Sequence, residues 1–223
     1  MDLVREAARN NALWCDAVCR AHGQITEFTE DLWICLGTPP RFHSNATTLH
    51  QGAQFAIESL RPKGFKDGFF DIDGTQLGYR ELFRAHWIAL RDPEPAPLSL
   101  TWRRVSTDEE LQTWEAGWAA GDPEAAQHPR QFPPSLLKTP DHAFLGGYRD
   151  DQLVAGCILN QTVPVVGLSN VFSLSEQNPW PDLAQLGQGY FPGLPIVGYE
   201  RGEDLEQATE AGFARIGELR VWV

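Results

Sequence analysis

The sequence predicts an α+β fold in which helices flank a mixed, mostly antiparallel sheet. Two observations support this fold class: segments with strand-like and helix-like patterns alternate over residues 98–223, and the first half of the chain repeats part of that order. The 223 residues include 42% hydrophobic and 22% charged residues, an ordinary globular composition, and they suffice for one large domain or two small ones.

The first predicted element is a helix over residues 3–21, which ends before Gly23, a suitable C-terminal cap. Cys15 and Cys19 lie one turn apart on its apolar stripe. The chain has four cysteines, and they form neither a CxxC motif nor zinc-ribbon spacing. We therefore expect buried, reduced thiols and no metal site.

Proline marks the expected division of the chain. RDPEPAP, residues 91–97, is too rich in proline for a helix or a central strand, so it is the best linker candidate. It separates a first half, residues 1–90, from a domain over residues 98–223. In that domain LSLTWRRV alternates like a strand, and Ser106 with Glu109 forms a capping-box pattern that begins a helix.

The remaining elements of the second half follow from apolar runs and turn residues. HAFLGGY and LVAGCILN flank RDDQ and predict a hairpin, and VVGLSNVFSL predicts a further strand. A helix around 182–190, the strand LPIVGYE, a helix from about Asp204 to Ala211 and the ending GFARIGELRVWV follow. The predicted order is β-α-β-β-β-α-β-α-β.

The first half repeats part of this order. HSNATTL (43–49) is similar to LSNVFSL (168–174), and a helical stretch follows each, AQFAIESL in one half and PDLAQLGQGYF in the other. Next come the strands FKDGFFDI and LPIVGYE, and then the closing segments GYRELFRAHWIAL (78–90) and GFARIGELRVWV (212–223). The shared order indicates an internal duplication whose first copy lacks most of one helix. The rival hypothesis is a single α+β domain whose order coincides by accident.

In element order, residues 98–223 resemble the GNAT (GCN5-related N-acetyltransferase) superfamily. GFARIGELRVWV is similar to the family's closing Gly-Phe followed by a final strand pair, and VVGLSNVFSL lies where the family's fourth strand leads toward acyl-coenzyme A. The resemblance implies acetyl-CoA or another acyl-CoA as cofactor and a small-molecule or peptide amine as substrate. It also implies a tandem GNAT arrangement with a trimmed first unit.

The resemblance places candidate cofactor-binding residues on the fourth strand and just after it. Asn170, Val171 and Phe172 lie on the strand, where splayed backbone groups of the family hold the pantetheine arm. Gln177 and Asp182 lie in the region that approaches the pyrophosphate in the family. Asn170 has an alternative role, which is to satisfy backbone groups at the end of a paired strand.

The loop after this strand departs from the family motif [RQ]-x-x-G-x-[GA], whose N–H groups point at the pyrophosphate. Gln177 fits the first position, but Trp180 replaces the first glycine. Pro179 and Pro181 have no N–H to donate, and Glu176 adds negative charge. We expect a poor phosphate site here. The loop around Gly52 in the first half has neither proline nor acid and would oppose a phosphate less, although an ordinary turn is the simpler interpretation.

Two residues at the end of LPIVGYE are the candidate catalytic groups. Glu200 follows an apolar strand, where a partly buried carboxylate with a raised pKa would serve as general base toward the amine. Tyr199 would reprotonate the leaving thiolate, but on a regular strand it points to the opposite face. The alternatives are a Glu200 that is solvated or paired with Arg201, and a Tyr199 in the core. EDLEQATEAGF lacks the tyrosine that the family commonly uses.

Net charge of −12 argues against a nucleic-acid surface, because phosphate backbones are bound by Lys and Arg. Neither a signal-peptide pattern nor a long apolar run occurs, so we expect a cytoplasmic protein without membrane spans. The leading hypothesis is an acyl-CoA-dependent N-acyltransferase with a divergent cofactor loop. The alternative is an inactive GNAT-fold module for ligand binding or interaction, and charge disfavours a tandem transferase that uses aminoacyl-tRNA. A homodimer paired through the last strand is also open.

Overall fold

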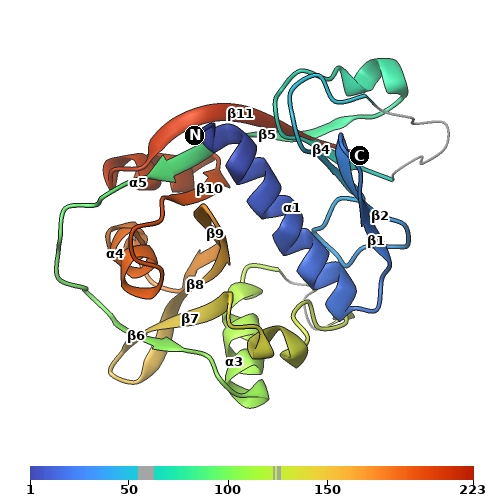
Figure 1. The fold of residues 1–223 in the computed structure, drawn as a ribbon. Helices are drawn as coiled ribbons and strands as arrows, with labels where there is room; N and C mark the ends of the chain where they lie inside the picture. The colour runs from blue at the N-terminus through green and yellow to red at the C-terminus, as the bar shows by residue number, and fades with distance from the viewer. Residues whose placement is uncertain (55–62, 123, 125–126) are drawn as a thin grey trace.

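The computed structural model describes residues 1–54, 63–122, 124 and 127–223 (Figure 1). The predicted helix AQFAIESL falls mostly outside these residues. The elements, in chain order, are α1 (Leu3–Ala21), β1 (Thr26–Phe28), β2 (Leu32–Cys35), β3 (Ala46–Thr48), β4 (Phe65–Asp67), η1 (Gly74–Leu77), β5 (Glu81–Leu90), β6 (Thr101–Arg104), α3 (Asp108–Trp118), η3 (Pro134–Lys138), β7 (His142–Arg149), β8 (Gln152–Thr162), β9 (Val165–Ser173), α4 (Trp180–Tyr190), β10 (Ile196–Glu200), α5 (Gly202–Glu210) and β11 (Ala214–Trp222).

Both halves of the chain contribute to one sheet of 11 strands, in the order β1-β2-β3-β4-β11-β5-β10-β9-β8-β7-β6. Neighbouring strands are antiparallel except for two parallel pairs, β3 with β4 and β9 with β10. The predicted α+β class with a mixed, mostly antiparallel sheet is confirmed, as is the element order of the second half.

The last strand of each half lies inside the sheet of the other half. β11 lies between β4 and β5, and β5 lies between β10 and β11. The two series β2-β3-β4-β11-β5 and β8-β9-β10-β5-β11 therefore have the same arrangement. This arrangement supports the proposed duplication, with the short η1 in place of α5. The strand pairing equates different residues of the two halves than the sequence match does. Ala46 pairs with Phe65 as Val166 pairs with Ile196, so Ala46 corresponds to Val166 in the sheet, whereas the sequence match aligned it with Val171.

Two features of the last strand bear on the sequence-based expectations. The ending GFARIGELRVWV forms one strand rather than a strand pair, because its partner β5 comes from the first half. The same strand pairs with β5 along its length and with β4 over Arg220–Trp222, so its end lies between two strands of its own chain. A homodimer through this strand would have to use the edge of β11 before Arg220, and it stays a prediction. The sheet itself ends at β1 and β6.

Helices cover both faces of the sheet, which curves around α1 (Figure 1). α1 contacts strands near both ends of the sheet, namely β1, β2 and β3 on one side and β8, β9 and β10 on the other. α3 shares a hydrophobic cluster with α1, whereas α4 and α5 share a cluster on the opposite face. In the described part of the chain, no helix is long and apolar enough to cross a membrane.

Local sequence explains where the helices begin and end. α1 has the predicted bounds: the Asp2 side chain accepts from the Arg5 N–H at its start, and Gly23 with φ +74° follows its end. The capping box of α3 lies one residue later than predicted, at Thr107 and Glu110. The shift follows because the Glu110 carboxylate reaches the backbone N–H of Thr107.

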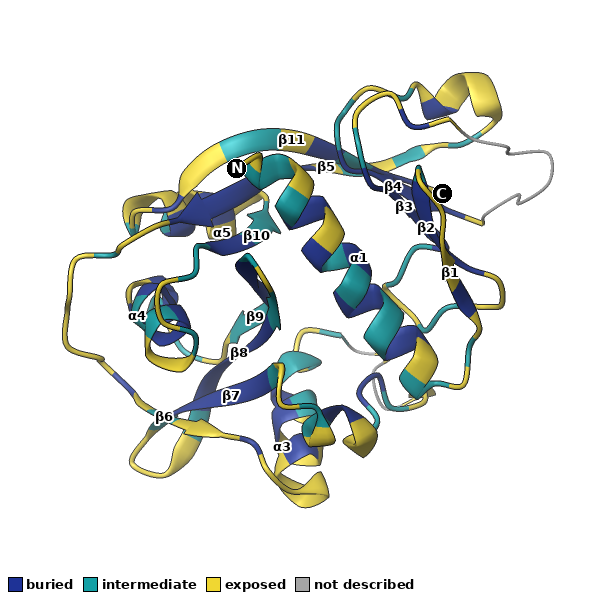
Figure 2. Ribbon diagram, viewed as in Figure 1, coloured by how far each residue is buried: buried dark blue, intermediate teal, exposed yellow. Residues whose placement is uncertain are grey.

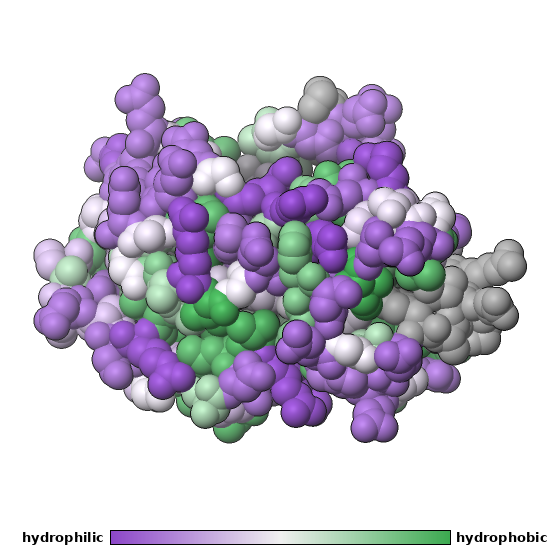
Figure 3. Space-filling model, turned by 90° about the horizontal axis from the view of Figure 1, so that it is seen from above, coloured by the Kyte–Doolittle hydropathy of each residue, from purple (hydrophilic) through white to green (hydrophobic). Residues whose placement is uncertain are grey.

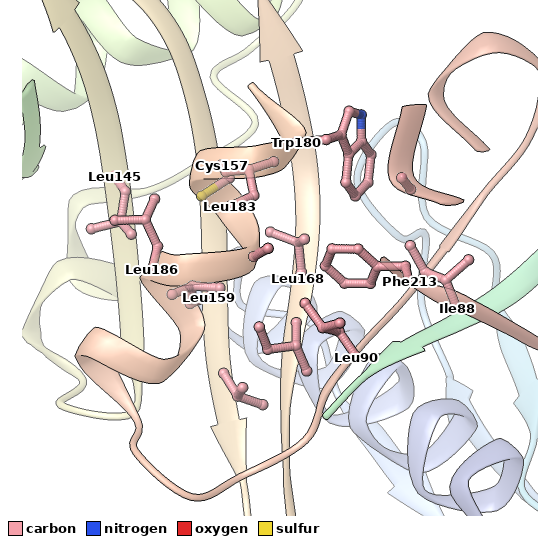
Figure 4. Close-up of a cluster of buried hydrophobic side chains, with 14 of the residues drawn as sticks. Ile88, Leu90, Leu145, Cys157, Leu159, Leu168, Trp180, Leu183, Leu186 and Phe213 are labelled. Atoms are coloured by element: carbon pink, nitrogen blue, oxygen red, sulfur yellow. The ribbon is translucent and has the colours of Figure 1, made fainter. Parts of the chain in front are cut away.

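The largest core cluster lies between the sheet and the helices α4 and α5. Figure 4 shows side chains of these elements converging, with the Trp180 and Phe213 ring centroids 5.5 Å apart. All four cysteines are buried free thiols, as expected. Buried and intermediate residues run along α1, whereas the linker over 91–97 is mostly exposed (Figure 2). Hydrophilic side chains cover most of the face seen in Figure 3, with hydrophobic areas between them.

Candidate functional site

The parallel strands β9 and β10 separate after two residue pairs. Val166 pairs with Ile196 and Gly167 with Val197, and no further pair forms between them. Gly198 lies at the point of separation, where a Cβ atom would come within 2.7 Å of a backbone carbonyl oxygen of β9. Beyond it, the facing edges of both strands have backbone groups without a partner strand. We call this opening the β9–β10 split.

A bulge in β9 faces this split. Asn170 and Val171 together oppose the single residue Cys157 of β8, because the register shifts between Ser169 and Phe172. Asn170 has φ +52°, a left-handed conformation that is uncommon outside glycine. Bulges re-aim backbone and side-chain groups and recur beside functional sites. The candidate cofactor residues on β9 thus lie on irregular backbone at the split.

A cavity of about 640 Å³ lies between the two halves of the chain and reaches the split. Residues of α1, of both parallel strand pairs and of the segment before β3 line it. Its volume falls within the range of small-molecule sites, roughly 300–1,000 Å³. Asn170, Val171, Tyr199 and Glu200 all line this cavity, so the structure brings four of the sequence-predicted residues together.

Glu200 and Tyr199 leave β10 on opposite faces, as expected for a strand that stays in register with β5. Burial, reinforced by the charge of Asp204, raises the pKa of Glu200 to about 8. The positive charge of Arg201 offsets part of this rise, although the two side chains form no ion pair in the described structure and the Arg201 guanidinium lies 4.7 Å from the Phe83 ring centroid. The protonated and the charged forms of Glu200 are therefore both populated near physiological pH.

Tyr199 occupies the α1 side of the sheet. Its ring makes an edge contact with Trp87, at a centroid distance of 5.6 Å. The Lys66 Nζ atom lies 4.3 Å from the centroid of the same ring. Tyr199 thus combines core packing with exposure to the cavity.

Lys66 is a functional candidate that the sequence analysis missed. It is only 5% exposed, and its Nζ donates a hydrogen bond to Asn11 Oδ1 at 2.5 Å. The available signal was a lysine at the second position of FKDGFFDI, a segment predicted as a strand. Its partners come from α1 and β10, which no local pattern connects to β4.

His43 lies near Lys66 in the same cavity and is uncharged. Burial lowers the pKa of His43 to about 4, and the positive charge of Lys66 contributes in the same direction. Gln131 Nε2 lies 3.0 Å from His43 Nδ1 and fixes the ring. The imidazole therefore presents hydrogen-bonding groups to the cavity without a charge.

The loop after β9 uses its N–H groups internally. The Ser175 N–H donates to Ser173 Oγ and the Gln177 N–H to Ser175 Oγ, both at 3.3 Å. The Trp180 N–H donates to Asn178 Oδ1 at 2.9 Å. Three N–H groups that could otherwise reach a phosphate therefore already have a partner.

The second cavity, of about 460 Å³, adjoins this loop and is acidic. Glu176, Glu203 and Asp204 line it, and no lysine or arginine does so among the described residues. Trp118 and Val171 line both cavities, so the two meet at the split. A pyrophosphate does not fit this chemistry, because its charge would face carboxylates instead of N–H groups.

Asp182 serves the fold of the linker region. Its carboxylate is buried and accepts four hydrogen bonds, from the Ser99 N–H and Oγ, the Leu100 N–H and the Trp102 Nε1. The side chain therefore holds the end of the linker against α4 instead of facing the loop. Gln177 turns the same way and donates from Nε2 to Ser99 Oγ.

The N–H groups of the loop around Gly52, in the first half, also have partners within the chain. The Gly52 N–H donates to Asp71 Oδ2 at 2.6 Å, and the Gln54 N–H donates to Asp31 Oδ1 at 3.2 Å. Two carboxylates of the chain itself thus take the positions that an anion would need. Within the described ranges, no group of three or more His, Cys, Asp and Glu side chains is placed to hold a metal ion.

Comparison with protein-family models and with curated proteins finds no match for this sequence. Solved structures do match. A GCN5-related N-acetyltransferase from Kribbella flavida superposes with a TM-score of 0.63 at 17% identity, over 97% of this chain and 94% of that one. A conserved protein of unknown function from Staphylococcus epidermidis gives 0.63 at 14% identity, over 89% and 92%. An acetyltransferase of the GNAT family from Colwellia psychrerythraea gives 0.52 at 12%, over 89% and 84%.

Proposed function

The chain has the GNAT fold, and from this premise we propose that it is an acyl-CoA-dependent N-acyltransferase acting on a small amine or a peptide amine. The observation that carries the proposal is the β9–β10 split, which leads past the bulge at Asn170 into a cavity that Glu200 lines. A narrow opening for a donor and a titratable carboxyl group beside an acceptor cavity are the two requirements of this chemistry.

Different parts of an acyl-CoA fit this site unequally. The free backbone edges of Leu168–Val171 and Gly198–Glu200 suit the amide-rich pantetheine arm. The loop over residues 173–180 does not suit the phosphates, because three of its N–H groups are occupied, Pro179 has none and its neighbours are acidic. We propose that the chain holds the donor by the arm and gains little from the phosphates.

Glu200 and Tyr199 have the proposed catalytic roles. The chemistry that a bound thioester supplies is an activated acyl carbon, which exchanges its bond to sulfur for a bond to the acceptor nitrogen. Glu200 takes the proton that the nitrogen loses, and a pKa of about 8 leaves it basic enough for the task. Tyr199 leaves β10 on the opposite face from Glu200 but lines the same cavity, and we assign to it the proton that the departing thiolate gains where the donor passes through the split.

A comparison of two donors tests this proposal. We expect acetyl transfer from acetyl-CoA and from S-acetylpantetheine with kcat/KM values within about tenfold, because each missing phosphate contact would otherwise contribute about 1.5–3 kcal/mol. Initial rates with a panel of amines give the two values. A preference for acetyl-CoA by several powers of ten would show that the phosphates are bound after all.

The second candidate is an inactive GNAT-fold module, and the internally bonded loop is the observation that favours it. Calorimetric titration separates the two. Binding of either donor supports the enzyme, whereas no binding of acetyl-CoA, CoA or S-acetylpantetheine at millimolar concentration would leave the module as the better hypothesis.

A further inference from the structure

The cavity between the halves differs in charge from the molecule that contains it. The chain has a net charge of −12, yet Glu200 is the only Asp or Glu side chain among the described residues that line the cavity. Three lysine and arginine side chains line it as well, namely Arg41, Lys63 and Lys66. Arg41 is neutralised by Asp122, its partner at 2.6 Å, and Lys63 is exposed. Lys66 is therefore the buried cation of the cavity.

Lys66 lacks a countercharge within the described part of the chain. Its hydrogen bond goes to the neutral amide of Asn11, and its other contact is the face of the Tyr199 ring. The nearby His43 is uncharged, and Asn45 and Thr47 of the same wall are buried neutral groups. Burial of an ammonium group without an opposite charge costs free energy, so such a group is expected where a ligand supplies the charge.

The positions of Lys66 and Glu200 give the cavity two chemically different ends. The Lys66 Nζ atom lies against the ring of Tyr199. Glu200 is the next residue along β10, and it lines the same cavity although its side chain leaves the strand on the opposite face. A ligand whose anionic group meets Lys66 therefore reaches Glu200 by extending through the cavity to the split. The volume of about 640 Å³ allows a molecule of amino-acid or dipeptide size.

We propose that Lys66 binds a carboxylate of the acceptor, so that the acceptors are small molecules bearing both a carboxylate and an amine, with the amine directed toward Glu200. This inference rests on the proposed acyltransferase function for its catalytic part. The carboxylate site itself depends only on the cavity and on Lys66, so binding can be measured without any donor.

The experiment uses matched acceptors and matched lysine variants. The acceptors are unbranched amino acids from glycine to ε-aminocaproate and the dipeptide glycylglycine, each beside its carboxamide, which lacks only the negative charge. Lys66→Met removes the buried cation and keeps a long side chain. Lys138→Met removes an exposed cation of η3, outside the cavity, and is the control. Calorimetry measures binding without donor, and initial rates with acetyl-CoA or S-acetylpantetheine measure transfer.

We expect at least one carboxylate of the series to bind the parent protein about tenfold or more tightly than its carboxamide, the effect of one charge-assisted hydrogen bond. The preference should vanish in Lys66→Met and persist in Lys138→Met. Equal binding of both forms throughout the series, or a preference that survives in Lys66→Met, would overturn the inference.

The two proposals fail in different ways. Lys66-dependent carboxylate binding without acetyl transfer from either donor would refute the enzyme and leave the carboxylate site standing. Transfer at equal kcat/KM to acids and carboxamides would support the enzyme and refute the role of Lys66. Circular dichroism of Lys66→Met verifies that the variant is folded.

Discussion

At the scale of single residues, the folded structure disfavours the charged form of Glu200. Burial and Asp204 raise its pKa from 4.5 to about 8. The unfolded chain therefore loses this proton at lower pH than the folded protein. Between the two values the folded protein binds more protons, so this residue makes the free energy of unfolding fall as pH rises through that window.

Replacement of Glu200 by Gln should flatten this dependence. Above pH 8 we expect Glu200→Gln to be more stable than the parent, by on the order of 1–3 kcal/mol after allowance for partial solvent access, while turnover falls. Urea denaturation at pH values from 5 to 9 measures the difference. Glu206→Gln, on the exposed side of α5, is the control. Parallel stability curves for Glu200→Gln and the parent would contradict the raised pKa.

The sequence predicts Glu200 and not Lys66, and the reason is physical. Glu200 ends an apolar strand, so its burial follows from its immediate neighbours. The significance of Lys66 depends on Asn11 and Tyr199, which are distant in sequence and meet only in the folded cavity. Asp182 is a residue that the resemblance assigned to a cofactor and that long-range contacts give another role. Four donors from the linker region and β6 occupy its carboxylate.

At the scale of elements, the split between β9 and β10 depends on a glycine. A Cβ atom on Gly198 would come within 2.7 Å of the Leu168 carbonyl oxygen, closer than normal van der Waals contact. The backbones approach closely here and then separate. A side chain at this position must push the two strands apart where they are still joined.

We expect Gly198→Ala to lower the free energy of unfolding by about 1–3 kcal/mol and to weaken donor binding, because the strands must shift. Gly189→Ala is the matched control, since a Cβ there meets nothing within 4 Å. A helical alanine should leave stability unchanged or raise it slightly. Denaturation and donor titration on both variants give the answer, and identical behaviour of the two would show that the close approach is unimportant.

Local patterns predicted the elements of the second half well because each has a distinct apolar period and clear turn residues. They missed β1 and β2, which are three and four residues long and too short to show a period. The bulge at Asn170 was also beyond the sequence, since it depends on the register between β8 and β9. Register depends on long-range pairing, which no single strand specifies.

At the scale of the whole molecule, the two halves are interlocked. The proline-rich segment 91–97 separates them in sequence, but β5 and β11 cross to the other half within the sheet. Arg220 of β11 strengthens this link by pairing with buried Asp67 of β4 at 3.2 Å. We therefore propose that the halves are units of sequence duplication that fold only together.

Chain cleavage tests this interdependence. We expect a fragment of residues 1–93 to remain unfolded alone, because β4 and β5 lack the strand that lies between them. Mixing it with a fragment of residues 94–223 should restore near-ultraviolet circular dichroism and a single species of full size. A full chain with a Gly-Ser insertion at the same point should fold normally. Cooperative unfolding of the isolated first fragment would refute the proposed interdependence.

The central place of β11 also sets the order of events during synthesis. The ribosome makes residues 214–222 after all the other described strands, yet β4 and β5 can join the sheet correctly only around them. Until then the two strands expose unpaired edges and apolar faces, which is the condition under which nascent chains aggregate or recruit chaperones. The first half is thus complete as a sequence long before it can be complete as a structure.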